Sequence, residues 1–179
     1  MNRFLENISN LFNESNKEIG FGSKSKTKNS RKALLFQELK PESPVYEKYI
    51  DGVIYKDVEF DKLKKLSNKD VLGGLIFPDK MISLEKLENY NFDFAILHDL
   101  NISSEFLLSE KIAPGFYIDS NLDDSTYDTI NNIPFSFVVI DLINKPKYET
   151  LSGIFDLTKI ISNIDNNIIL KLHYIPNEK

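Results

Sequence analysis

Four short apolar segments of this sequence end in an aspartate, and the aspartates recur at nearly constant spacing. They are Asp79, Asp99, Asp119 and Asp141, at steps of 20, 20 and 22 residues. Both histidines of the chain, His98 and His173, also follow apolar segments. Carboxylates and imidazoles can hold a divalent metal, and an imidazole can accept or release a proton near neutral pH. The residue types therefore suit metal-assisted or acid–base chemistry, provided that the fold brings them together.

The elements that would position these residues read as repeated βα units. Seven strands are predicted, over 33–36, 51–55, 73–77, 94–97, 115–118, 137–140 and 168–173. They are apolar at nearly every position, as expected of parallel strands that are covered on both faces, and helical patterns lie between them. The glycine motifs of nucleotide-binding open sheets are missing. We therefore predict an α/β fold of parallel βα repeats, TIM-barrel-like and incomplete, with about seven strands and an N-terminal helical extension.

Residues 33 to 175 resemble a (β/α)8 barrel, the triosephosphate-isomerase-type fold. With its short N-terminal helix and basic linker, the chain is also similar to an uncharacterised group of bacterial barrel-like proteins. That group has no assigned reaction, so the resemblance implies no catalytic residue. A complete barrel has eight strands in about 250 residues. We expect either an incomplete barrel or a strand beyond Lys179.

In a parallel βα fold the carboxyl ends of all strands face one side, so we expect the strand-end residues to share one rim. The catalytic candidates are His98, His173, Asp119 and Asp141, and the ligand-binding candidates are Tyr55, Asp79 and Asp99. A divalent metal held there would polarise a carbonyl or activate water in a lyase or hydrolase that acts on a small molecule. The alternative is structural, because an aspartate after a strand also caps the following helix or forms a turn. For Lys171, inside the seventh strand, we expect a place at a sheet edge or in solvent rather than a role as a Schiff-base amine.

The N-terminus predicts an amphipathic helix over 1–14, a basic flexible linker over 15–32 and the barrel-like domain over 33–179. The helix has an apolar stripe at the three-to-four spacing of one helical face, formed by Phe4, Leu5, Ile8, Leu11 and Phe12. The linker carries Lys24, Lys26 and Lys28 among glycine, serine, threonine and asparagine. Such a segment can hold a protein on an anionic membrane. The alternative is a helix that packs on its own domain or on a second copy of the chain.

Charge and composition limit the function. The net charge is −5, with +4 on residues 1–32 (seven Lys or Arg against three Glu) and hence −9 on the remainder, which argues against nucleic-acid binding. The chain has no cysteine, which suits a reducing cytoplasm and excludes thiolate chemistry. We therefore expect a cytoplasmic domain, peripheral to the membrane or bound to a protein partner through its tail, and non-catalytic or degenerate. The alternative is a lyase or hydrolase with its site at the strand ends.

Overall fold

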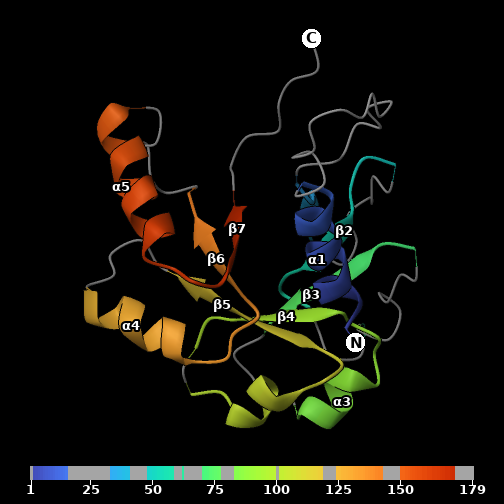
Figure 1. Ribbon diagram of the computed structural model, residues 1–179. Coiled ribbons are helices and arrows are strands. Elements are labelled where there is room, and N and C mark those ends of the chain that lie inside the picture. The colour runs from blue at the N-terminus through green and yellow to red at the C-terminus, as the bar shows by residue number, and fades with distance from the viewer. Residues whose placement is uncertain are drawn as a thin grey trace. The chain divides into compact units, whose positions relative to one another are not determined.

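The structure is a computed structural model, which describes residues 2–15, 33–40, 48–58, 62, 70–77, 83–99, 101–118, 124–142 and 150–171. From residue 72 onwards, strands and helices alternate along this part of the chain (Figure 1). The strands are β1 (Phe36–Leu39), β2 (Gly52–Tyr55), β3 (Leu72–Ile76), β4 (Phe94–Leu97), β5 (Ala113–Ile118), β6 (Phe137–Asp141) and β7 (Asn167–Lys171). The helices are α1 (Arg3–Ser15), α3 (Leu84–Glu88), α4 (Asp124–Asn132) and α5 (Leu151–Ser162), with a 3-10 helix, η2 (Ser104–Leu108).

The strands form one sheet in the order of the sequence, β1 to β7. The pairs β1–β2, β2–β3, β5–β6 and β6–β7 are parallel. A doubly wound sheet reverses its strand order at a switch point, whereas a sequential order is that of a barrel. The described residues hold seven strands, one fewer than a complete barrel. The predicted fold class is therefore confirmed: parallel βα repeats, barrel-like and incomplete, with an N-terminal helix.

Most strands lie where they were predicted, but β1 begins at Phe36 instead of ending there. Phe36 pairs with Gly52 of β2, and its ring fills the space beside this glycine: a Cβ added to Gly52 would lie 2.6 Å from Phe36 Cε1. In this register the Phe36 ring therefore packs directly over Gly52, where a side chain would leave no room for the ring. Of the helical patterns expected between the strands, the one between β4 and β5 forms the 3-10 helix η2.

The chain divides into two compact units, each with its own core. Unit 1 comprises residues 1–95 and 108–113, and unit 2 comprises residues 96–107 and 114–179. The core of unit 1 includes the fully buried Val53, Leu75 and Phe94, and that of unit 2 includes Phe137 and Ile140. In both units the buried residues come mainly from the strands, as the continuous apolar segments predict.

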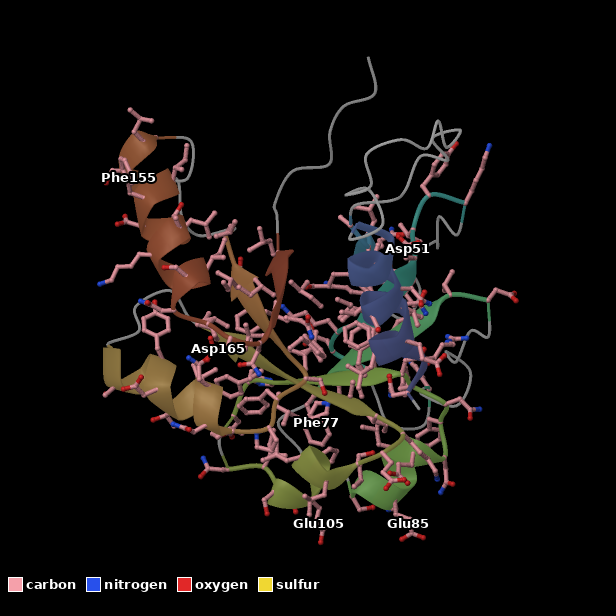
Figure 2. The ribbon with its side chains drawn as sticks, in the orientation of Figure 1. Asp51, Phe77, Glu85, Glu105, Phe155 and Asp165 are labelled. Atoms are coloured by element: carbon pink, nitrogen blue, oxygen red, sulfur yellow. The ribbon has the colours of Figure 1, made fainter. Side chains whose placement is uncertain are left out.

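Within unit 2, α5 presents apolar side chains to solvent as well as to the core. Gly153 and Ile160 are buried, whereas Leu151 and Phe155 are 76% and 73% exposed. Figure 2 shows Phe155 projecting from the outer side of α5. The helix begins after Thr150, whose side chain accepts a hydrogen bond from the Gly153 N–H at 3.2 Å and caps the helix.

Candidate functional site

The strand-end residues predicted from the sequence fall into two groups. Asp79, Asp119 and His173 lie outside the described residues, as do Lys24, Lys26 and Lys28 of the linker and the side chain of Phe12. Tyr55 belongs to unit 1, and His98, Asp99 and Asp141 belong to unit 2. Each is described within its own unit.

Tyr55 makes a packing contact and Asp99 makes hydrogen bonds within a turn, and both kinds of contact are structural. Tyr55 ends β2 and is 5% exposed, and its ring packs edge-on against Phe92 with 6.4 Å between the ring centroids. Asp99 is exposed and accepts hydrogen bonds from the backbone N–H and the side-chain amide of Asn101, each at 2.9 Å. This is the local turn role that was the alternative for the strand-end aspartates. His98 precedes Asp99 and is also exposed.

Asp141 lies in a cluster with two residues that the sequence analysis did not assign to the rim. The Tyr117 hydroxyl, from β5, donates a hydrogen bond to Asp141 Oδ2. Lys171 Nζ, from β7, lies 3.8 Å from the same oxygen and 5.8 Å from the centre of the Tyr117 ring. We call these three residues the Tyr–Asp–Lys cluster. It joins the carboxyl ends of three consecutive strands within unit 2.

The strand register explains why these three side chains meet. Tyr117 pairs with Val139, and Asp141 pairs with Lys171. Because side chains alternate between the two faces of a strand, Asp141 lies on the same face as Val139, two residues before it. Tyr117, Asp141 and Lys171 therefore share one face. The backbone N–H of Leu142 donates to the Lys171 carbonyl at 3.0 Å and continues the pairing beyond Asp141.

The cluster combines a cation, a carboxylate and a phenol in a partly solvated place. The side chains of Asp141 and Lys171 are 16% and 20% exposed. On the same face of β6, Val139 and Phe137 are 3% and 0% exposed and form an apolar floor. Electrostatic interactions are stronger beside such a floor than in bulk water. The described residues contain no group of three or more histidine, aspartate or glutamate side chains that could hold a metal ion.

A second constellation of polar contacts lies at the start of the chain, in unit 1. Asn2 is 7% exposed, and its Oδ1 accepts hydrogen bonds from the backbone N–H groups of Phe4, at 2.9 Å, and Leu5, at 3.3 Å. It therefore caps α1. Its Nδ2 donates to the Asp93 carbonyl at 2.7 Å and to the Lys111 carbonyl. One side chain thus caps the helix and ties it to the segments before β4 and β5.

Arg3 fixes the same end of α1 to the strands. Its guanidinium binds the Asp93 carboxylate in a bidentate manner, with Nε–Oδ1 and Nη2–Oδ2 distances of 3.0 and 2.7 Å, and it donates to the Val71 carbonyl at 2.6 Å. Asp93 Oδ2 also accepts the Gly73 N–H at 2.7 Å. Bidentate pairing of arginine with a carboxylate fixes orientation as well as adding energy. The contact therefore sets the position of α1 on the ends of β3 and β4.

Phe4 completes this attachment, and we call Asn2, Arg3 and Phe4 the N-terminal anchor. Phe4 is 0% exposed. Its ring centroid lies 4.6 Å from that of Phe94 and 6.1 Å from that of Phe36. Gly74 and Gly52 make room for these two rings, because a Cβ on either glycine would overlap its neighbour. Helix α1 accordingly packs on its own unit (Figure 1), which is the alternative that the sequence analysis left open.

The rest of the apolar stripe on α1 is less buried. Ile8 and Leu11 are half-buried, and Ser9 and Asn10, which lie outside the stripe, are exposed. Sequence reasoning missed the anchor, although Asn2 stands two residues before Phe4, the first residue of the apolar stripe, and an asparagine just before an apolar helical pattern is a recognised helix-start signal. It also missed the partner of Arg3, because the carboxylate of Asp93 is distant in the sequence.

Comparison with known proteins identified no relative. No protein-family model, curated protein or solved structure showed a significant match to the chain. The resemblance to a group of bacterial barrel-like proteins therefore stays a prediction. Among the helices in the described part of the chain, none is long and apolar enough to cross a membrane.

Proposed function

We propose that this chain is a non-catalytic, barrel-like binding domain that attaches to an anionic surface through the basic residues of segment 15–32. The surface is that of a membrane or of an acidic protein partner, and the protein is cytoplasmic and peripheral to it. The observation that supports this proposal most directly is the N-terminal anchor. It holds α1 on the domain and so fixes the point from which the basic segment starts.

The anchor changes which residues would carry the attachment. Phe4 is the first apolar residue of the stripe that could enter a membrane, but it is fully buried in unit 1. The positive charges of the segment, and not insertion of the helix, would therefore bind the surface. Segment 15–32 has six Lys or Arg and one Glu, a net charge of +5, whereas residues 33–179 carry −9. An anionic surface would attract the segment and repel the domain.

The expected strength follows from the number of cations. Each Lys or Arg close to an anionic membrane contributes about 1 kcal/mol, so five net charges give about 5 kcal/mol. The attraction should weaken as salt shortens the screening length, which is about 8 Å at physiological ionic strength. Replacing three lysines should weaken binding about a hundredfold.

Vesicle co-sedimentation tests the proposal on the full chain, with α1 intact. Lys24, Lys26 and Lys28 are changed together to glutamine, and binding to vesicles of phosphatidylcholine with phosphatidylserine is compared with that of the unchanged protein. The matched control changes Lys62, Lys86 and Lys159, all exposed on the folded part, to glutamine. This control variant loses three positive charges, as the variant of the basic segment does.

We expect the linker variant to lose most of its binding and the control to keep it. Equal loss in the two variants would show that only net charge matters, and equal retention would show that the segment is not the attachment site. Both results contradict the proposal for a membrane. Pull-down with an immobilised poly-glutamate peptide applies the same comparison to an acidic protein surface.

The rival function is a lyase or hydrolase with its site at the strand ends, and it stays a separate proposal. Two of its catalytic candidates, Asp119 and His173, lie outside the described residues. Of the others, Asp141 contacts Tyr117 and Lys171 (above). Metal analysis of the purified protein, with His98→Ala and His173→Ala variants, tests it. Bound metal that is lost in both variants supports this alternative.

A further inference from the structure

Helix α5 differs from α4, the preceding helix of unit 2, in the residues that it presents to solvent. Both helices bury one side, which includes Tyr127 and Ile130 of α4 and Gly153 and Ile160 of α5. The exposed side chains described on α4 are all polar: Ser125, Asp128, Thr129 and Asn132. Those of α5 include four large apolar side chains. Because the solvent side of a surface helix is normally polar, α5 has the pattern of a helix with a partner on both sides.

The apolar side chains form one row along α5, which we call the α5 stripe. It consists of Leu151, Ile154, Phe155 and Ile161, which are 76%, 50%, 73% and 40% exposed. Their spacing places them on one side of the helix, and Figure 2 shows Phe155 pointing away from the strands of the unit. Thr158 lies within the stripe, and its hydroxyl donates to the Ile154 carbonyl at 2.8 Å. Covering the stripe therefore leaves this hydroxyl with its hydrogen bond.

The area of the α5 stripe is close to what a small dimer interface requires. Taken together, the four exposed fractions exceed two whole side chains, and at roughly 200 Å² for a large apolar side chain this is about 400–500 Å². The largest apolar patch of a typical monomer is about 300–600 Å², and it is often functional. Two copies of the stripe would bury about 800–1,000 Å², near the roughly 1,000 Å² of the smallest specific interfaces.

The charges of α5 favour a second copy of the chain over a membrane as the partner. The α5 stripe contains no charged residue, so two copies related by a twofold axis bring no like charges together within it. Helices that lie on membranes have a polar face rich in lysine and arginine. Helix α5 instead has one lysine, Lys159, and one aspartate, Asp156, and so lacks the positive charge that an anionic membrane would attract.

We infer that the α5 stripe is the contact surface of a weak homodimer, in which α5 packs antiparallel against α5 of a second copy. In this arrangement Phe155 packs over the small side chain of Thr158 in the second copy, and Leu151 lies near Ile161 of that copy. The same contacts occur twice, because a twofold interface is made of one surface on both partners. The contact uses no residue of the basic segment, so it is independent of the attachment proposed above.

Sedimentation velocity of the full-length chain, without vesicles, measures the dimer. We expect the mean mass to rise from that of a monomer toward that of a dimer between about 10 μM and 1 mM, the range of weak association. Phe155→Gln should weaken the dimer at least about tenfold. Leu151→Gln and Leu108→Gln are a matched pair, since the two leucines are 76% and 79% exposed but only Leu151 belongs to the stripe. We expect only Leu151→Gln to weaken the dimer.

A single cysteine locates the contact, because the chain has none of its own. Thr158→Cys and Thr129→Cys are matched, since both threonines are exposed on helices of unit 2. In addition, both hydroxyls donate to the carbonyl four residues earlier, at 2.8 and 3.0 Å. With diamide as the oxidant, we expect Thr158→Cys to form a disulfide-linked dimer several-fold faster than Thr129→Cys, because only the first brings two thiols close together.

Four results would overturn the inference. The first is a chain that stays monomeric up to about 1 mM; if Phe155→Gln then reduces vesicle binding, the α5 stripe contacts a membrane. The second is a dimer that dissociates in molar salt, where screening acts within about 3 Å, because such a dimer would join a basic segment to an acidic domain. The others are equal association of the two leucine variants and equal cross-linking of the two cysteine variants. The vesicle binding of the linker variant enters none of these results, so the two proposals fail separately.

Discussion

The substitution Phe4→Ala tests whether α1 belongs to the folded domain. The Phe4 ring is fully buried and contacts the rings of Phe36 and Phe94. Burying a phenylalanine side chain contributes about 1.5–3 kcal/mol, and aromatic pairs add about 0.5–1.5 kcal/mol. With the cavity that alanine would leave, the expected loss of unfolding free energy is about 3–5 kcal/mol.

Urea unfolding followed by far-UV circular dichroism and tyrosine fluorescence measures this loss, without vesicles. Tyrosine is the reporter because the chain has eight tyrosines and no tryptophan. The control is Leu11→Ala, on the same helix and the same apolar stripe but only half-buried, for which we expect a clearly smaller loss. If the two variants lose the same small amount, within about 0.5 kcal/mol of the unchanged protein, α1 is not docked and the argument from the anchor fails.

Two further predictions concern the space that a glycine leaves for a neighbouring ring and the pH dependence of stability. Gly74→Ala should destabilise unit 1 by about 3 kcal/mol in urea unfolding, since its Cβ would overlap the Phe94 ring. Gly73→Ala, whose Cβ would meet its nearest neighbour only at 3.6 Å, should be neutral or slightly stabilising, and equal effects would contradict the packing. Two hydrogen bonds, the more important from Ser109 and the other from Lys111, hold the pKa of Glu88 below its usual value. The stability that Glu88→Gln removes at neutral pH should therefore shrink in thermal melts as the pH falls through that lowered pKa, and a difference constant down to strongly acidic pH would refute this.

The fold was predictable because its signal is local and repeated. Most strands are short apolar segments closed by a polar residue, and the repetition alone indicates parallel βα units. The start of β1 was wrong because Leu34 and Leu35 continue the apolar pattern, although Leu35 is 59% exposed. In the observed register the Phe36 ring packs over Gly52 of the neighbouring strand. This contact joins two strands, so the residue pattern of a single segment does not predict it.

The candidate site was predictable only in part, for a related reason. The strand-end aspartates are visible in the sequence, and Asp141 is indeed in a polar cluster. Its partners Tyr117 and Lys171 stand inside the predicted strands, and for Lys171 the expectation was a sheet edge or solvent. Only the strand register shows that they share a face with Asp141. The sequence could have suggested them through the two-residue alternation, had the pairing between strands been known.

The energy of the anchor also decides how α1 and the basic segment can act together. If α1 had to leave unit 1 in order to enter a membrane, the release would cost about the 3–5 kcal/mol attributed to Phe4, in addition to the Arg3–Asp93 contact. The net charge of +5 on segment 15–32 supplies an attraction of similar size, about 5 kcal/mol. Release would therefore cancel most of the gain in binding. Attachment with α1 docked keeps that gain, which favours the segment and not the helix as the binding element.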